Sequence, residues 1–207
     1  MWAGVLRCPN QSLVEVMFRV IGITRPDFYA GEARQITELL ETCRVDIIHL
    51  RKPQAKPEQV AALLQELSPE VRKHLMIHDF FALAPGFGLR GIHLNGRHPD
   101  IPPYITGAYR VSCGCHTISE LVAQKSRVDF EGNPLMDYLF LSPVFDSISK
   151  PGYYAAFAPE VMAKAGKMGI IDQRVIALGG VTPHRFDQLA QWHFGGAAML
   201  GHIWKSV

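Results

Sequence analysis

The sequence predicts a single-domain (β/α)₈ barrel, a closed ring of eight parallel strands surrounded by helices. Short apolar runs alternate with amphipathic stretches along the whole chain, and eight such runs are present. The last two runs end in glycine-rich segments, ALGGVTP at 177–183 and FGGAAMLG at 194–201. In such barrels the loops after the last two strands often bind a phosphate group through backbone N–H groups. A five-stranded doubly wound sheet is the alternative, but eight candidate strands fit a closed barrel better.

The expected strands are short and apolar on both faces, which is typical of parallel strands covered by helices. They are Phe18–Ile23, Asp46–Arg51, Leu75–His78, Gly91–Leu94, Ala108–Ser112, Asp137–Ser142, Arg174–Leu178 and Gly195–Leu200.

The expected helices lie between these strands, at 31–43, 57–67, 117–125, 158–169 and 182–192. The clearest is 31–43, where Ile36, Leu39 and Cys43 recur at three- and four-residue spacing. Thr182 before Pro183 is a typical helix start. Eight units in about 190 residues require several short helices, above all after the third and fourth strands. Only HIWKSV follows the eighth strand, so we expect a short or missing final helix.

Composition and charge exclude several classes of protein. The chain has 207 residues, of which 48% are hydrophobic and 19% are charged, and its formal net charge is +2. Lys and Arg form no stripe, so we expect no nucleic-acid partner. No apolar run reaches the roughly 20 residues of a membrane span, so we expect no membrane partner.

The cysteines and the N-terminus carry no expected function. The four cysteines show neither CxxC nor zinc-finger spacing, and we expect reduced thiols and a cytoplasmic location. Residues 1–16 are expected to be an N-terminal extension, with Met17 as a natural start and 17–207 as the barrel domain. A short final helix would leave apolar surface for a second copy, so we also expect a homo-oligomer.

Polar residues gather where the expected strands end, which is the face that carries the active site in such barrels. The strand ends read IIHLRKP, LMIHDFF, GIHLNGRH, VSCGCHT and LSPVFDSISKPGY. Four histidines, an arginine, an aspartate and a Ser-x-Ser-Lys loop are therefore expected on one face.

The chain resembles the thiamine phosphate synthase/TenI superfamily of (β/α)₈ barrels from about Phe18 to Ile203. The resemblance rests on an ordered series of motifs: IIHLRKP, MIHDFF, GIHLN, GCHT, DYLFLSPVFDSISK and VIALGGV. It implies a role in thiamine biosynthesis, with a thiazole phosphate as ligand and, for a synthase, a pyrimidine pyrophosphate as well.

Departures from the family pattern separate two activities. A synthase releases pyrophosphate and needs Mg²⁺ held by carboxylates. The resemblance places one of these carboxylates at Asp79, but Arg97 and His98 stand where the second is expected. A TenI-like tautomerase only moves a proton, so it needs no metal cofactor and a histidine can serve as its general acid/base. The tautomerase is therefore the expected activity and the synthase the alternative.

The resemblance also implies the residues of the site. The implied catalytic residues are His116, His49, Arg51 and Lys150. The implied substrate- and phosphate-binding residues are His78, Ser147, Ser149, Gly179, Gly180, Gly201 and His202, and Asp79 would bind Mg²⁺ only in a synthase.

Two further possibilities remain open from the sequence. The chain could be a non-catalytic regulator that binds a phosphorylated ligand without turnover. The histidines could instead form a transition-metal hydrolase site, but the first expected strand, FRVIGIT, lacks the H-x-H of such barrels.

Overall fold

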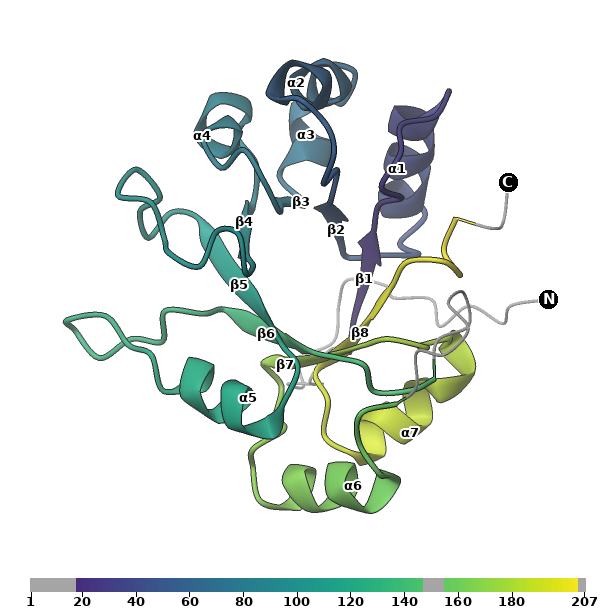
Figure 1. Cartoon of the computed structure of the whole chain (residues 1–207). Coiled ribbons are helices and arrows are strands. Elements are labelled where there is room, and N and C mark those ends of the chain that lie inside the picture. The colour runs from purple at the N-terminus through teal and green to yellow at the C-terminus, as the bar shows by residue number, and fades with distance from the viewer. Residues whose placement is uncertain (1–17, 147–154, 205–207) are drawn as a thin grey trace, which may run out of the picture.

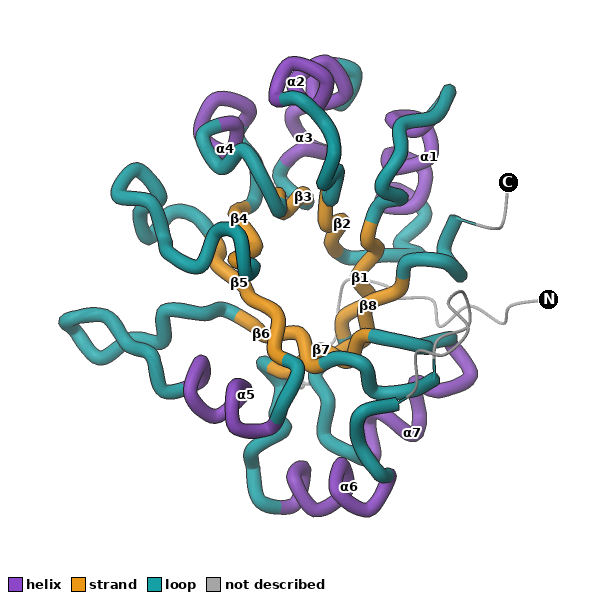
Figure 2. Tube along the Cα trace, viewed as in Figure 1, coloured by secondary structure: helices purple, strands orange, loops and turns teal. Residues whose placement is uncertain are grey.

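The computed structural model describes residues 18–146 and 155–204. Its centre is a closed barrel of eight parallel strands in chain order, and β1 pairs with β8 to close the ring (Figures 1 and 2). The strands are β1 (Arg19–Ile23), β2 (Ile47–Leu50), β3 (Leu75–Ile77), β4 (Gly91–Leu94), β5 (Arg110–Cys115), β6 (Tyr138–Leu141), β7 (Val175–Leu178) and β8 (Gly196–Met199). The predicted (β/α)₈ barrel is confirmed.

The helices surround the ring on its outer side (Figure 2). They are α1 (Glu32–Glu41), α2 (Pro57–Gln65), α3 (Pro69–Arg72), α4 (Leu83–Phe87), α5 (Ile118–Lys125), α6 (Pro159–Lys167), the 3₁₀ helix η1 (Pro183–Arg185) and α7 (Phe186–Gln191). As expected, the helix after β3 is short. A short helix was also expected after β4, but the described residues form none between β4 and β5, and none after β8. Within the described ranges no helix is long and apolar enough to cross a membrane.

Side chains alternate along each strand between the barrel interior and the layer under the helices. On β2, Ile48 and Leu50 pack in the outer layer, whereas Ile47 and His49 point inward. The inner layer is a separate hydrophobic cluster. Its buried members are Ile21, Ile23, Ile47, Met76, Tyr138, Phe140, Ile176 and Ala198. This cluster forms a floor inside the barrel, below the carboxyl ends of the strands.

Three local predictions were wrong. Strand β5 runs to Cys115 rather than ending at Ser112, because Cys113 and Cys115 are buried in the outer layer despite the intervening glycine. The short helix α3 was not predicted, since it spans too few residues to show a helical repeat. The helix after β7 begins at Pro183 as predicted, but the Thr182 side chain makes no capping hydrogen bond.

Candidate active site

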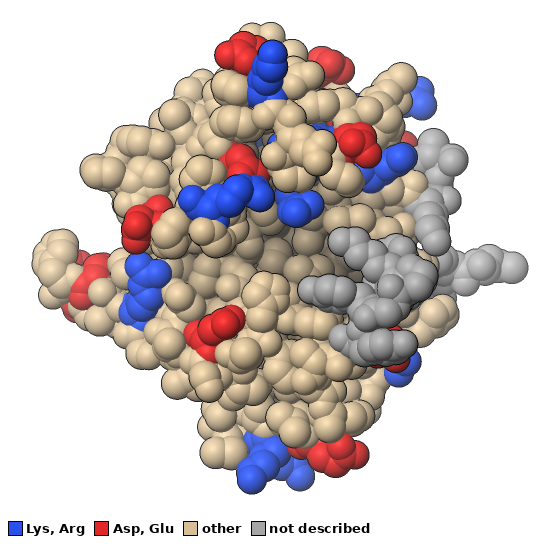
Figure 3. All heavy atoms as spheres, viewed as in Figure 1, with Lys and Arg blue, Asp and Glu red and all other residues tan. Residues whose placement is uncertain are grey.

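A cavity of about 670 Å³ opens at the carboxyl ends of the strands. All eight strands contribute to it, from their ends or from the residues that follow. Its lining includes Arg51, His78, His93, Gly114, His116 and Gly179. Viewed down the barrel, this surface is hollowed near its centre, and Lys and Arg side chains gather along the side of β3 and β4 (Figure 3). The cavity therefore suits an anionic ligand.

His116 lies at the edge of this cavity, directly after β5. Its Nδ1 is 3.1 Å from the Ser142 carbonyl oxygen and 3.3 Å from the Ser142 hydroxyl. When Nδ1 carries the hydrogen and donates it to the carbonyl, the Nε2 lone pair is free to act as a base. The His116 backbone N–H also donates to the Glu120 carboxylate at 2.6 Å, and the Thr117 side chain caps α5 by accepting from the Glu120 N–H. The start of α5 thus fixes the position of His116.

Arg51 follows β2 and lines the same cavity. Its backbone N–H donates to the Thr24 hydroxyl at 2.9 Å, which joins the segments after β1 and β2. No ion pair to Arg51 is found among the described residues, so its guanidinium is available to a carboxylate or phosphate group.

Three histidines from neighbouring strands meet below the cavity. His49 Nδ1 lies 2.9 Å from His78 Nε2, and the rings of His78 and His93 stack at 4.2 Å between centroids. His49 Nε2 is 2.6 Å from the Tyr138 hydroxyl, and His93 Nδ1 is 2.9 Å from the Ser112 hydroxyl. His49 is fully buried, whereas His78 and His93 are 6% and 5% exposed and face the cavity.

Burial keeps this cluster uncharged. Desolvation, with the neighbouring imidazoles, lowers the pKa of His49 and of His78 well below the usual range. Burial, aided by the Arg51 charge, lowers the pKa of His93 to about 3. Burial also raises the pKa of the Tyr138 hydroxyl. All four side chains are therefore neutral at pH 7.

Asp79, which follows His78, forms an ion pair with Arg97 and lies near His98. Its Oδ1 accepts from Arg97 Nη2 at 2.7 Å, and His98 Nε2 lies 3.5 Å from the same oxygen. Its Oδ2 is buried and has no hydrogen-bond partner among the described residues. The next carboxylate after β4, Asp100, is exposed. Asp79 thus offers a single oxygen atom, next to a guanidinium group.

The glycine pair after β7 packs tightly against the loop after β6. Gly179 and Gly180 have positive φ angles of 94° and 62°, which favour glycine. A Cβ on Gly180 would lie 2.1 Å from the Asp146 carbonyl oxygen, and a Cβ on Gly179 would lie 2.8 Å from Pro143 Cα. Any side chain would therefore displace the loop, and no backbone acceptor for the Gly180 N–H is found in the described part of the chain.

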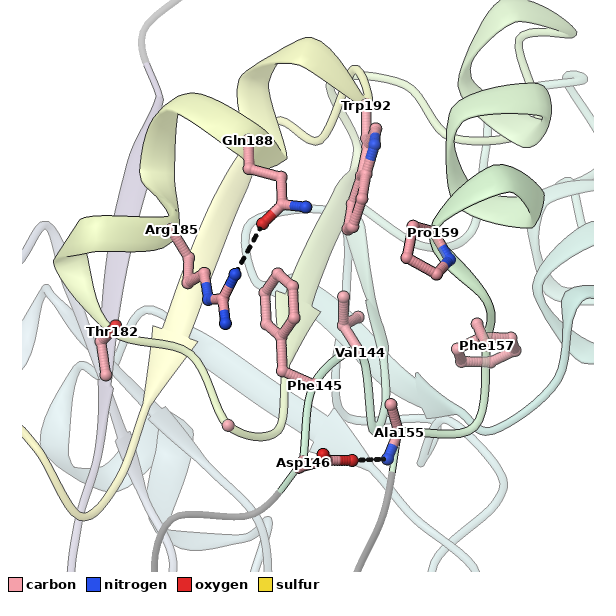
Figure 4. Close-up of a pocket in the computed structure, with 11 residues that line it drawn as sticks. Val144, Phe145, Asp146, Ala155, Phe157, Pro159, Thr182, Arg185, Gln188 and Trp192 are labelled. Carbon is pink, nitrogen blue, oxygen red and sulfur yellow. Dashed lines mark hydrogen bonds between the residues drawn. The ribbon is translucent and has the colours of Figure 1, made fainter.

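A second cavity of about 360 Å³ lies between the loop after β6 and the η1–α7 segment (Figure 4). Gly180, Thr182 and Arg185 line it. Arg185 Nη1 donates to Gln188 Oε1 at 3.1 Å, and its guanidinium lies over the Phe145 ring at 4.9 Å (Figure 4). This arrangement places a cation beside the backbone of Gly180.

Comparison with known proteins identifies the family. A profile described as thiamine monophosphate synthase matches residues 20–203. The chain belongs to this family.

Individual family members show how distant the relationship is. A thiamine-phosphate synthase of Pasteurella multocida is 23% identical over 163 residues, which cover 76% of this chain and 71% of that protein. The crystal structure of a thiamine phosphate pyrophosphorylase from Bacteroides thetaiotaomicron is 33% identical, with a TM-score of 0.78 over 92% of this chain and 86% of that one. A thiamine phosphate pyrophosphorylase from Pyrococcus furiosus shares the fold, with a TM-score of 0.66 at 17% identity, over 88% and 85% of the two chains.

The structure brings together part of the site implied by the family resemblance. Arg51, His78, His116 and Gly179 share the large cavity. His49 lies below it, and Gly180 lines the second cavity. Gly201 and His202 follow β8 and line neither cavity, while Ser147, Ser149 and Lys150 lie outside the described residues.

Sequence reasoning missed three residues of this thiamine monophosphate synthase family member. Tyr138 sits in an apolar run, and nothing there marks its hydroxyl as a partner of His49. Arg97 was considered only as a residue that replaces an expected carboxylate. Its positive charge after β4, on the strand next to the one that Asp79 follows, was a usable signal for an ion pair. Arg185 lies three residues after Thr182, within the first turn of a predicted helix, where a role beside Gly180 carries no sequence signature.

Proposed function

We propose that this chain acts in thiamine biosynthesis as a TenI-like thiazole tautomerase, with His116 as the general acid/base. Membership of the thiamine monophosphate synthase family supports the role in thiamine biosynthesis. The ion pair between Asp79 and Arg97 favours the tautomerase over the synthase, because it occupies a carboxylate that a synthase needs for Mg²⁺.

The donor set around Asp79 does not fit Mg²⁺. This ion prefers several oxygen ligands in octahedral geometry, including one or two carboxylates. Here one carboxylate oxygen is bonded to Arg97, His98 offers a nitrogen, and the neighbouring guanidinium repels a dication. The proposed reaction therefore uses no Mg²⁺ at this site.

The proposed reaction transfers one proton within the substrate. His116 Nε2 accepts a proton from one carbon of the thiazole phosphate carboxylate as that C–H bond breaks. It then returns the proton to a second carbon, which restores the neutral imidazole and leaves the ring aromatic. The Ser142 carbonyl holds Nδ1–H throughout and stabilises the transient imidazolium. The reaction consumes no co-substrate.

Arg51 in the large cavity and the glycine pair, which lies between the two cavities, would bind the substrate. Arg51 suits the carboxylate, since a guanidinium can donate two parallel hydrogen bonds to it. The phosphate would lie at the glycine pair, where Gly180 has a backbone N–H without an acceptor among the described residues.

The second candidate is a thiamine phosphate synthase. The names of the similar proteins from Pasteurella multocida and Bacteroides thetaiotaomicron favour it. In a synthase, Asp79 would have to leave Arg97 and bind Mg²⁺ when the pyrophosphate arrives.

Two assays on the same three proteins distinguish the candidates. Wild type, His116→Ala and Asp79→Asn are each tested for tautomerisation of the thiazole phosphate carboxylate, and for pyrophosphate release with Mg²⁺ and both synthase substrates. We expect tautomerisation by wild type and Asp79→Asn, a loss of about 100-fold or more in His116→Ala, and no pyrophosphate release. Mg²⁺-dependent release that disappears in Asp79→Asn would instead establish the synthase.

A further inference from the structure

The cluster of His49, His78 and His93 is not used by the proposed proton transfer, yet it is built from three adjacent strands. His49 lies on β2, His93 on β4, and His78 directly after β3. One ring nitrogen from each histidine lies within 4.8 Å of the others. Because inward-pointing positions recur every second residue, the strand pairing brings the three rings to one place inside the barrel.

Hydroxyl groups hold the far side of two of these rings. The Tyr138 hydroxyl binds His49 Nε2, and the Ser112 hydroxyl binds His93 Nδ1. The opposite nitrogens, His49 Nδ1 and His93 Nε2, are then directed toward His78 and the cavity. Metal-binding histidines show this pattern, with one nitrogen on the metal and the other in a hydrogen bond that fixes the tautomer.

The cluster is also accessible from the cavity. His78 and His93 line it, and Gly114 on β5 leaves open the space next to His93 Nε2, where a Cβ would lie 3.9 Å from that nitrogen. A fourth ligand from the cavity, such as water or an anionic oxygen, can therefore approach the three nitrogens.

We propose that His49, His78 and His93 bind a transition-metal dication of the zinc type, with its fourth coordination position open to the cavity. Three imidazole nitrogens suit Zn²⁺, Co²⁺ or Ni²⁺, whereas Mg²⁺ and Ca²⁺ require oxygen ligands. Three protein ligands plus one open position is the arrangement of catalytic zinc sites.

To hold the ion, one ring must rotate, because the stacked rings of His78 and His93, with planes 27° apart, direct their nitrogen lone pairs nearly parallel. A tetrahedral site with Zn–N bonds of about 2.0–2.1 Å separates its nitrogens by roughly 3.3 Å. His49 Nδ1 and His78 Nε2 would move apart from 2.9 Å, and the hydrogen they share would leave or shift to His78 Nδ1. The Arg51 charge nearby opposes a dication and makes an anion in the fourth position favourable.

The test is metal binding by the resting protein, which does not depend on tautomerase activity. The full chain is stripped with a chelator and titrated with Zn²⁺ by calorimetry and with Co²⁺ by visible absorption. We expect one ion per chain and the intense d–d absorption of four-coordinate Co²⁺. Zn X-ray absorption of the wild-type protein should show nitrogen neighbours at about 2.0–2.1 Å.

Variants then locate the site. His93→Phe keeps a ring against Phe140 and should weaken Zn²⁺ binding by about 100-fold, whereas Tyr138→Phe removes only the supporting hydroxyl and should weaken it by about tenfold. The exposed His74→Ala is the matched control and should bind Zn²⁺ as wild type does. Absence of binding by the wild-type protein, an oxygen-only shell, or equal affinity in wild type and a folded His93→Phe would overturn the proposal. The X-ray absorption result decides the case if His93→Phe does not fold.

Discussion

His116 is oriented by two contacts at the edge of the cavity, one at its ring and one at its backbone. The ring contact with the Ser142 carbonyl orients the imidazole, and the backbone contact with Glu120 fixes where the residue sits. Ser142 lines the cavity but Glu120 does not, so the Glu120 contact can be altered without changing the cavity lining.

Glu120→Ala tests the backbone contact. Loss of the 2.6 Å hydrogen bond should let His116 shift and lower the tautomerase kcat by about tenfold, with little change in KM. Steady-state kinetics measure this effect, with Glu58→Ala on α2 as a control that should keep the wild-type kcat. A wild-type kcat in a folded Glu120→Ala protein would show that the contact does not position His116.

Arg97→Asp tests whether the ion pair with Arg97 keeps Asp79 from binding Mg²⁺. The change removes the ion pair and adds a second carboxylate, so the variant should bind Mg²⁺ more tightly than wild type by about tenfold or more in titration calorimetry. Arg97→Ala removes the ion pair without adding a ligand and separates the two effects. The interpretation is wrong if wild type binds Mg²⁺ as tightly as Arg97→Asp.

At the scale of elements, a buried ion pair joins the start of α1 to the segment after β2. Lys52 and Glu32 are each 2% exposed, and Lys52 Nζ lies 2.7 Å from Glu32 Oε1. Lys52 Nζ also donates to the carbonyl oxygens of Arg25 and Asp27. The hydrogens of its ammonium group are thus directed toward the β1–α1 connection and the start of α1. Lys52 is therefore committed to structure and does not line the cavity.

Breaking this pair should cost stability. Lys52→Met leaves the Glu32 carboxylate buried without its cation and should lower the free energy of unfolding by about 3–5 kcal/mol in urea denaturation. Glu32→Leu combined with Lys52→Met should cost less than the sum of the single changes, because neither charge is then left alone. Additive losses would mean that the two residues act independently.

The elements themselves could largely be predicted from the sequence, because buried parallel strands and amphipathic helices leave clear apolar patterns. The seven strands other than β5 were predicted to within one residue at each end. The contacts inside the barrel could not be predicted in the same way. The His49–His78 contact depends on strand register and ring rotation, and the Arg97–Asp79 pair depends on how the segment after β4 folds back over β3.

For the whole molecule, three buried neutral imidazoles make stability depend on pH. An unfolded histidine titrates near 6.5, whereas His93 in the folded protein stays neutral down to about pH 3. Between these values the unfolded state binds more protons than the folded state, so the free energy of unfolding falls as the pH decreases. The contribution of His93 to stability is complete above about pH 6.5 and is lost progressively below it. The guanidinium groups of Arg51, Arg90 and Arg97 also contribute to the lowered pKa values of the cluster.

Urea denaturation in chelator-containing buffer at about pH 7 and about pH 5.5 measures this dependence. Each buried histidine should contribute up to about 1.4 kcal/mol per pH unit. His93→Phe should therefore reduce the slope by about that amount, while the exposed His74→Ala should leave it unchanged. Identical slopes in wild type and His93→Phe would contradict a neutral His93 in the folded state.

The barrel closes without a helix after β8 in the described part of the chain. Ile203 is buried, and Trp204 Nε1 donates to the Ile23 carbonyl oxygen at 2.6 Å, so the segment after β8 packs against the end of β1. The expected homo-oligomer remains a prediction.

The rate of thiazole tautomerisation in Mg²⁺-free buffer, compared between wild type and His116→Ala, tests the proposed tautomerase mechanism. We expect full turnover by wild type without Mg²⁺ and a fall of about 100-fold or more in the variant, because in this mechanism His116 Nε2 carries the proton. Equal rates in the two proteins, or a wild-type rate that requires Mg²⁺, would contradict it.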